Sequence, residues 1–543
     1  MSRRRPMPRL SQLALADVPP PIPAGRQALM AFVFLFLFGV PFFAAHLTLL
    51  RLPYFWDEHG QFIPTALDLW RDGAWVAHST LPNVHPPGVA MYLAAWFQAF
   101  GYSIPVVRIA MLVLACFGLV GVFLLGVELG KDLSKDLGYD SSSAPTLFLA
   151  PLLLMISPLF FMQGMMAQLD MPAMVLSVWA LWFFLRGNHA AAAAISVALV
   201  LAKETGILLP AIFFAVLFYE RKRVAAMGYV IAPIALGCWL MVLHHATGSW
   251  TGNADFAHYN ISYSLEPVRV VTTVVRRIYY LFFAEFRWIA TAALLFAIPR
   301  MALFRSRAWL VTGLFAAAHL ALISLLGGAA LERYVLPVLP LFYIAASLAF
   351  TTLPKRLNIA ATPLLAMGLV LSLFWNPPYP FPFENNLAMV DFVSLQQAAA
   401  EYTETHFALS RIATAWPYTA GLARPDFGFV RHGLTVIETN DFHRSSIAAI
   451  PPDQFDVLIT YTRTWAPKGG VVSIPLIRKF LTHFYGFEPE ITRGQCGELG
   501  LSPVRSWSRH GQQIILYLRT GPPESRSARN VGEPRASGRS ANL

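Results

Sequence analysis

Apolar runs close to the length of a membrane span recur along most of this chain and constrain its fold more than any other feature. A helix needs about 20 predominantly apolar residues to cross a bilayer. The 543 residues are 56% hydrophobic and only 13% charged, whereas about a quarter of the residues in soluble domains are charged. We predict about eleven membrane segments, at residues 28–50, 105–128, 145–164, 172–187, 189–202, 205–219, 224–246, 276–298, 308–326, 335–351 and 357–375. The sequence therefore predicts an all-α polytopic membrane protein with an N-terminal tail at 1–27, and excludes a soluble globular protein.

Two further segments, 60–74 and 86–100, are expected to lie along the membrane surface as interfacial helices. The first is mildly amphipathic, and the second begins at two prolines and carries aromatic residues that suit the headgroup region. In an alternative topology, 86–100 crosses the membrane and 189–219 forms one helix. That alternative would place Asp57 and Asp170 in opposite compartments.

Basic residues are concentrated in short loops and at the chain ends, although the formal net charge is +11. Cytoplasmic loops of membrane proteins are enriched in Lys and Arg. The basic clusters are Arg3, Arg4, Arg5 and Arg9, then Arg221-Lys222-Arg223, then Arg300, Arg305 and Arg307, then Lys355-Arg356. They predict a cytoplasmic N-terminus and an outer C-terminus, and they indicate membrane topology in place of a nucleic-acid partner. Three arginines fall on the predicted outer side and disagree with this pattern: Arg269, Arg276 and Arg277.

After Trp375 the composition changes. A Pro-rich linker opens the region 376–520, which we predict to be a small soluble α/β domain on the outer side. Its expected elements are a helix at 388–407 and strands at 411–416, 434–438, 456–461 and 512–519. The remaining residues, 521–543, are rich in Gly, Ser, Arg and Pro, a composition typical of a disordered tail.

An acidic pair, Asp57-Glu58, opens the first predicted outer loop, 51–104. Charge at a membrane face is costly to place without a function. Adjacent carboxylates suit two different roles, one as general base and the other binding or orienting substrate. The alternative is an Asp that caps the following helix. His85 ends the same loop, just before two prolines that fix the backbone, and is either a phosphate- or hydroxyl-binding group or a surface histidine.

Other charged residues border the later membrane segments. Asp170 opens the fourth predicted segment, where it either joins the site or caps the helix. Lys203-Glu204 lies between two apolar stretches, as part of a substrate site or as a buried structural ion pair. Arg333-Tyr334 faces outward, where the guanidinium can bind a lipid phosphate or anchor the chain at the interface. We expect no metal and no cofactor, because the adjacent histidines 244 and 245 point apart and the three cysteines are scattered.

Together these residues resemble the GT-C membrane glycosyltransferases, over about 28–375. The motifs that carry the resemblance are Phe55-Trp56-Asp57-Glu58, Val84-His85-Pro86-Pro87, Asp170 and Arg333-Tyr334-Val335-Leu336-Pro337. The nearest likenesses are the protein O-mannosyltransferases and the aminoarabinose transferases that modify lipid A. His85 matches the first group, where the second tends to carry Lys, and Gly88 replaces a leucine common in both.

This resemblance implies inverting transfer of a sugar from a polyprenyl-phosphate donor to a hydroxyl, on the periplasmic face of a bacterial inner membrane. Asp57 would be the general base, with Glu58 and Asp170 orienting the substrates. Arg333, Lys203 and His85 would support the leaving phosphate. The acceptor class (lipid, glycan or protein) stays open. The alternatives are a transporter or flippase of a lipid-linked substrate, and an oligosaccharide ligase or polymerase; a single outward cavity shared by Asp57 and Asp170 would favour the transferase.

Overall fold

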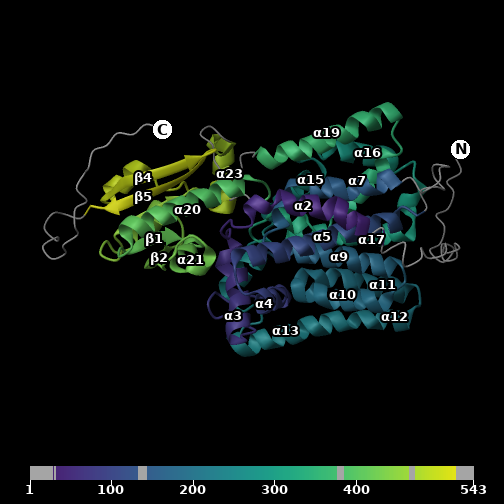
Figure 1. Cartoon of the computed structure of the whole chain (residues 1–543), viewed down its shortest axis with the longest axis horizontal. Helices are drawn as coiled ribbons and strands as arrows, with labels where there is room; N and C mark the ends of the chain where they lie inside the picture. The colour runs from purple at the N-terminus through teal and green to yellow at the C-terminus, as the bar shows by residue number, and fades with distance from the viewer. Residues whose placement is uncertain (1–28, 30–31, 132–143, 376–383, 464–470, 521–543) are drawn as a thin grey trace.

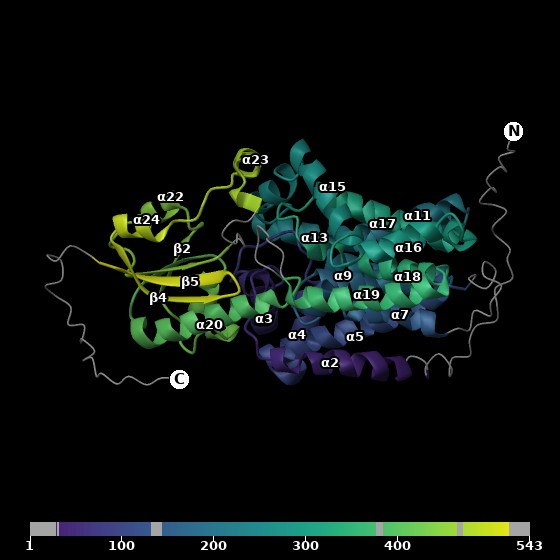
Figure 2. The same ribbon diagram turned by 90° about the horizontal axis from the view of Figure 1, so that it is seen from above.

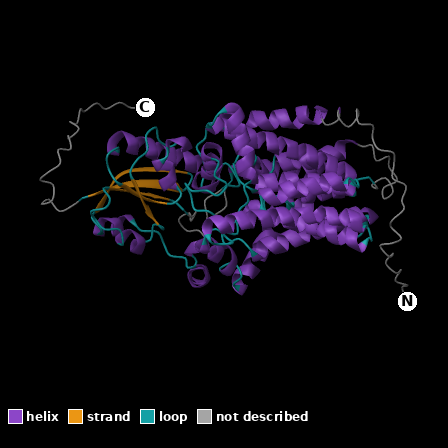
Figure 3. Ribbon diagram, turned by 90° about the horizontal axis from the view of Figure 1, so that it is seen from below, coloured by secondary structure: helices purple, strands orange, loops and turns teal. Residues whose placement is uncertain are grey.

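The computed structural model describes residues 29, 32–131, 144–375, 384–463 and 471–520. The two predicted tails and the predicted linker, 376–382, lie outside these residues. A helical bundle makes up most of the described chain, and a small mixed sheet with its own helices lies at one end of the bundle (Figures 1 and 3). This agrees with the predicted fold class at a coarse level: a mostly helical protein with a small C-terminal α/β part.

Four apolar helices are long enough to cross a membrane, within the part of the chain that is described. They are Ile104–Leu129, Arg223–Thr247, Arg307–Leu325 and Lys355–Phe374. The other apolar helices are 10–17 residues long, so the predicted number of eleven spans stays a prediction. The longer helices, given with their bounds, are α3 Ile63–Asp72, α4 Gly88–Phe100, α5 Ile104–Leu129, α7 Ala144–Met155, α9 Asp170–Leu185, α10 His189–Ala202, α11 Leu208–Tyr219, α13 Ile231–Thr247, α15 Pro267–Phe282, α16 Trp288–Ala297, α17 Arg307–Leu325, α18 Leu339–Phe350, α19 Lys355–Phe374, α20 Ala388–Phe407 and α23 Pro475–Tyr485.

Two predicted segments are broken in the structure. Segment 145–164 forms α7 and α8 (Pro158–Gln163), because Ser157 precedes a proline and takes an extended backbone. Segment 276–298 forms the end of α15 and α16. Between them Glu285 and Phe286 both have positive φ, which a continuous helix cannot accommodate.

The three arginines that disagreed with the charge pattern lie on α15 and bind within the protein. Arg269 pairs with Glu266 at 3.0 Å (Nε to Oε2), and Arg276 pairs with Glu332 at 2.8 Å (Nε to Oε1). Arg277 donates to the carbonyl of Leu331. These contacts account for basic residues at this position without a cytoplasmic loop.

Helices α3 and α4 form within the two segments expected to be interfacial, and their position at the membrane surface stays a prediction. They pack together, with the rings of Trp70 and Phe97 5.8 Å apart. At 13 residues, α4 is about 20 Å long, which is shorter than the roughly 30 Å hydrocarbon core. Figure 1 shows α3 at the end of the bundle that faces the sheet, whereas α12 (Arg223–Met227), which follows the basic cluster 221–223, lies at the opposite end.

The sheet has five strands in the order β2-β1-β3-β5-β4. Their bounds are β1 Ile412–Ala415, β2 Val436–Thr439, β3 Val457–Tyr461, β4 Leu501–Arg509 and β5 Gln512–Arg519. The strand β1 pairs in parallel with β2 and β3, and β5 is antiparallel to β3 and β4. The short helices α21 (Tyr418–Ala423), α22 (Arg444–Ala448) and α24 (Arg493–Glu498) complete this part, with α20 on one side of the sheet and α22 and α24 on the other (Figure 2).

All four predicted strands are present, and sequence reasoning missed β4. This edge strand is mostly exposed, so it lacks the buried run that marked β1 and β3.

Candidate active site

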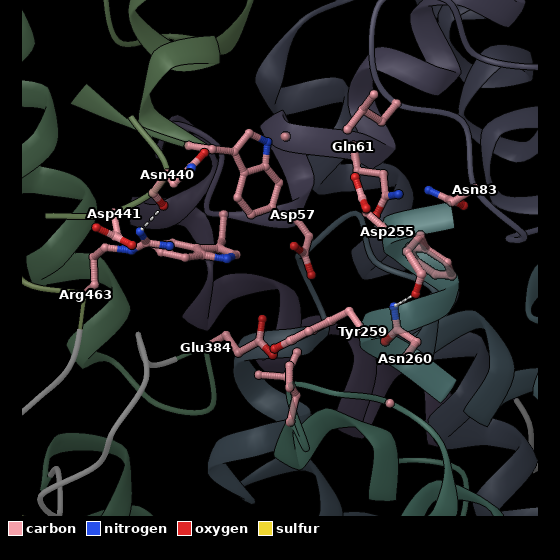
Figure 4. A pocket seen from close by; sticks show the side chains of 18 of the residues that line it. Asp57, Gln61, Asn83, Asp255, Tyr259, Asn260, Glu384, Asn440, Asp441 and Arg463 are labelled. Atoms are coloured by element: carbon pink, nitrogen blue, oxygen red, sulfur yellow. Dashed lines mark hydrogen bonds between the residues drawn. The ribbon is translucent and has the colours of Figure 1, made fainter. Parts of the chain in front are cut away.

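A cavity of about 1900 Å³ lies where the bundle meets the sheet, and both parts line it. Asp57 and Asp170 line this one cavity, as the transferase interpretation requires. Five more of the candidate residues line it too: His85, Lys203, Glu204, Arg333 and Tyr334. Figure 4 shows Asp57 projecting into the cavity from the bundle, with Asn440, Asp441 and Arg463 approaching from the sheet.

The guanidinium of Arg333 is the centre of the charged cluster. It comes from a 3₁₀ turn, Glu332–Val335, and is 4% exposed. It contacts three carboxylates: Asp57 at 2.5 Å (Nη2 to Oδ2), Asp170 at 3.0 Å (Nε to Oδ2) and Glu384 at 2.5 Å (Nη1 to Oε2). Planar guanidinium groups are well suited to hold several oxygens at fixed angles. The arrangement holds the Asp57 carboxyl group at the cavity wall.

Lys203 forms the second positive centre. Its Nζ lies 2.5 Å from Asp170 Oδ1 and 4.5 Å from the centre of the Tyr334 ring. Asp170 thus bridges Lys203 and Arg333 from the start of α9. Through Asp170, Lys203 and Arg333 belong to one cluster although they are 130 positions apart in the sequence. These two contacts favour a role for Asp170 in the site over a role as a helix cap alone.

His85 faces Glu204, and its Nδ1 lies 2.9 Å from Glu204 Oε2. The loop that carries His85 is held by Trp239, whose Nε1 donates to the carbonyl of Val84 at 2.9 Å. Gly88 follows the prolines, and any Cβ there would collide with the Leu201 carbonyl. The replacement of leucine by glycine therefore lets this loop approach the chain segment that leads to Lys203.

Glu58 does not line the cavity, and this corrects the predicted substrate-orienting role. Its side chain is 0% exposed and lies against the equally buried Arg108 of α5, at 2.5 Å (Oε1 to Nη1). It also accepts from the amides of Phe55 at 2.9 Å and Ala167 at 2.7 Å. Glu58 therefore ties the Asp57 loop to the bundle. Adjacent residues point apart, so Asp57 enters the cavity while Glu58 enters the core.

The backbone at Trp56 helps to aim Asp57. Trp56 has φ 43°, a left-handed conformation that is strained for a bulky side chain. Asp57 precedes the π-helical turn Glu58–Phe62, and its side chain makes no capping hydrogen bond to it. The helix-cap alternative for Asp57 therefore does not describe this site.

Glu384 is a site residue that sequence reasoning missed. Beyond Arg333, its Oε2 accepts from Gln168 Nε2 at 3.1 Å. Burial raises the pKa of Glu384 to about 7, helped by the negative charges of Asp57 and Asp170 and opposed by Arg333. Its only sequence signal is an acid directly after an aromatic and Pro-rich linker, which does not connect it to a loop more than 300 positions earlier.

Three possible metal ligands come together elsewhere, at Asp68, Asp72 and His78, with ligand atoms within 4.8 Å among the described residues. Asp68 Oδ2 already accepts from the amides of His78 and Ser79, both at 2.9 Å. These contacts close the loop after α3, and we assign no metal to them.

Comparison with solved structures identifies the fold. The chain has the GT-C membrane glycosyltransferase fold. It is similar to ArnT from Cupriavidus metallidurans, at 15% sequence identity and a TM-score of 0.51. That similarity covers 91% of this chain and 98% of the ArnT chain bound to undecaprenyl phosphate, or 100% of the ArnT chain in the apo state. A weaker likeness is to the Archaeoglobus fulgidus oligosaccharyltransferase, at 12% identity and TM-score 0.42, over 75% of this chain and 64% of that one. No protein-family model matches the sequence, and no curated protein matches it.

Proposed function

We propose that this protein is an inverting glycosyltransferase that moves a sugar from a polyprenyl-phosphate donor to an acceptor hydroxyl. One observation carries the proposal: the Asp57 carboxyl group lines a large cavity together with two buried cations, Lys203 and Arg333, and 18% of its side chain is exposed. A base at the cavity wall and cations nearby are what glycosyl transfer from a phosphate requires.

In the proposed reaction the acceptor oxygen attacks the anomeric carbon from the face opposite the phosphate. The new carbon–oxygen bond forms as the bond from the anomeric carbon to the phosphate oxygen breaks. The acceptor proton passes to the Asp57 carboxylate, and the electron pair of the broken bond leaves with the polyprenyl phosphate. The sugar carbon gains positive character in the transition state, as in glycoside chemistry generally.

The leaving phosphate is proposed to lie beside Lys203 and Arg333, and His85, which pairs with Glu204, lines the same cavity. Lys203 and Arg333 face three carboxylates, Asp57, Asp170 and Glu384. Since the pKa of Glu384 is raised to about 7, this carboxyl is partly protonated at neutral pH. A protonated Glu384 leaves more of the Arg333 charge for the phosphate. The structure of ArnT bound to undecaprenyl phosphate supports a polyprenyl phosphate as the lipid part of the donor.

The proposed location of the reaction is the periplasmic face of a bacterial inner membrane. The basic cluster 221–223 lies at the end of the bundle away from the sheet (Figure 1), and the cavity lies at the sheet end. The predicted cytoplasmic N-terminus and outer sheet domain agree with this placement.

The test is transfer of radiolabelled sugar from a polyprenyl-phosphate sugar, with the protein in proteoliposomes and a mixed acceptor extract. Wild type should transfer the label, and Asp57→Asn should lose at least a hundredfold in rate at unchanged protein level. The control is Asp72→Asn, at a side chain that is 53% exposed and does not line the cavity.

Equal rates in wild type and Asp57→Asn would remove Asp57 from catalysis. No transfer with any donor, together with movement of labelled lipid across the bilayer, would establish the flippase alternative instead.

A further inference from the structure

Three parallel strands of the sheet end at the cavity. The residues that follow them line it: Trp416 and Thr419 after β1, Asn440 and Asp441 after β2, and Thr462 and Arg463 after β3. Nothing in the proposed chemistry of the bundle uses this wall. It is nevertheless the part of the sheet where side chains from separate strands converge.

The strand order gives this wall a further property. β1 lies between β2 and β3 and is parallel to both, so the chain leaves β1 toward one neighbour and later returns to its other side. In open α/β sheets, ligands bind outside the carboxyl ends of the strands at such a switch in strand order. The edge of the sheet at which a ligand is expected to bind, formed by the carboxyl ends of β1, β2 and β3, therefore lines the cavity.

The strand ends also contact the segment that carries the base. The rings of Trp56 and Trp416 are 6.0 Å apart, and the Arg463 guanidinium lies 5.8 Å from the Trp56 ring. Trp56 directly precedes Asp57. A molecule held by the strand ends would thus lie next to the proposed base.

We propose that the carboxyl ends of β1, β2 and β3 form the acceptor subsite and that the acceptor is a glycan. This inference rests on the proposed function and names its acceptor class. The donor phosphate is assigned to the cations of the bundle. Asp57 contacts one of these cations, Arg333, while the adjacent Trp56 contacts the sheet. The hydroxyl to be deprotonated therefore comes from the sheet side.

The chemistry of the wall fits a sugar chain. Thr419 donates to Glu438 at 2.8 Å (Oγ1 to Oε2), and Arg463 donates to the Asn440 carbonyl at 2.8 Å, which holds these groups in place. The wall supplies hydroxyl, amide, carboxylate and guanidinium groups that can pair with sugar hydroxyls. Indole rings supply flat apolar faces for the carbon side of a pyranose.

The test separates acceptor binding from donor binding in the full-length protein in proteoliposomes. Three acceptor fractions from bacterial envelopes are offered with a labelled polyprenyl-phosphate sugar: lipid-free polysaccharide, total lipid extract and protein. The variants are Asn440→Ala and Trp416→Leu. The control is Asp453→Ala, an exposed position on the sheet domain that does not line the cavity.

We expect label in the polysaccharide fraction, resistant to protease and to organic extraction. Both variants should raise the KM for that fraction at least tenfold, with the KM for donor unchanged and the control equal to wild type. Label in lipid or protein, or a KM for polysaccharide that neither variant changes, would overturn this inference while the glycosyltransferase stands. Absence of both transfer and Asp57-dependent donor hydrolysis would overturn the proposed function as well.

Discussion

The Arg333 guanidinium donates to the Asp57 carboxylate at 2.5 Å (Nη2 to Oδ2), although 276 positions separate the two residues. Arg333 lies just before α18 and Asp57 lies in the loop before α3. The contact therefore connects the loop before α3 to a late part of the bundle. Both side chains face the cavity, so one interaction fixes the orientation of the proposed base and keeps a cation beside it.

Replacing Arg333 by Lys should lower the transfer rate at least a hundredfold. A lysine ammonium keeps the charge but cannot reach Asp57, Asp170 and Glu384 at once, because it lacks the planar fork of donors. Steady-state transfer in proteoliposomes measures the change. The matched control is Arg300→Lys on an exposed residue of the bundle. A variant that retains a tenth or more of the rate would show that charge alone suffices.

Glu384 should make stability depend on pH. Because burial raises its pKa to about 7, the folded protein binds a proton between about pH 4.5 and pH 7 that the unfolded chain does not bind. This contribution to stability is present at low pH, decreases as pH rises through that window and is lost above about pH 7. In Glu384→Gln the titrating carboxyl group is replaced by an amide, which does not bind this proton. The fall in unfolding free energy between pH 5 and pH 8 should therefore be smaller in the variant, by up to about 3 kcal/mol.

Thermal unfolding in detergent at pH 5, 6, 7 and 8 measures this difference between wild type and Glu384→Gln. Glu401→Gln, at an exposed position of α20, is the control and should follow the wild-type profile. Parallel profiles for wild type and Glu384→Gln would contradict the prediction.

Breaking the Glu58–Arg108 pair should destabilise the protein more than it affects binding. Either Glu58→Ala or Arg108→Met leaves one buried charge without its ionic partner, at a cost of about 3–5 kcal/mol. The double variant should be less destabilised than the sum of the two single changes. Thermal unfolding in detergent measures all three. Additive losses would show that the two groups act independently despite their 2.5 Å contact.

The coarse fold and much of the candidate site could be predicted from the sequence, for physical reasons that individual residues illustrate. Hydropathy marked the apolar helices, and scarce charges at their ends marked Asp57, Asp170 and Arg333. Adjacent residues point apart, so Asp57 and Glu58 could be expected to differ in role, but which of them enters the cavity depends on the turn at Trp56. The partner of Glu58 did leave a signal, because Arg108 lies inside a predicted span and a charge there requires a partner. Glu384 has almost no signal in the sequence that marks it as a site residue, because only folding brings it next to Arg333.

Lys203 should contribute to donor binding. Lys203→Met removes the ammonium that lies beside Asp170 and the Tyr334 ring, so the donor phosphate would lose a charge-assisted contact of about 1.5–3 kcal/mol. The KM for the polyprenyl-phosphate donor should rise between tenfold and a hundredfold, with the KM for acceptor unchanged. Lys222→Met is the control, since Lys222 is 58% exposed at the other end of the bundle. A change in the KM for acceptor alone would show that Lys203 binds the acceptor and not the donor.

Gly60 should prove essential to the contact between the two walls of the cavity. A Cβ at this position would lie 2.5 Å from Cζ2 of Trp416, so even Gly60→Ala must displace the indole that we assign to the acceptor subsite. We expect the KM for acceptor to rise at least fivefold in Gly60→Ala, with the KM for donor unchanged, because the donor phosphate is assigned to Lys203 and Arg333 and not to this indole. Gly237→Ala is the matched control, since a Cβ there meets nothing within 4 Å. If Gly60→Ala instead raises the KM for donor, the indole of Trp416 positions the donor sugar, and the acceptor must approach Asp57 from elsewhere in the cavity.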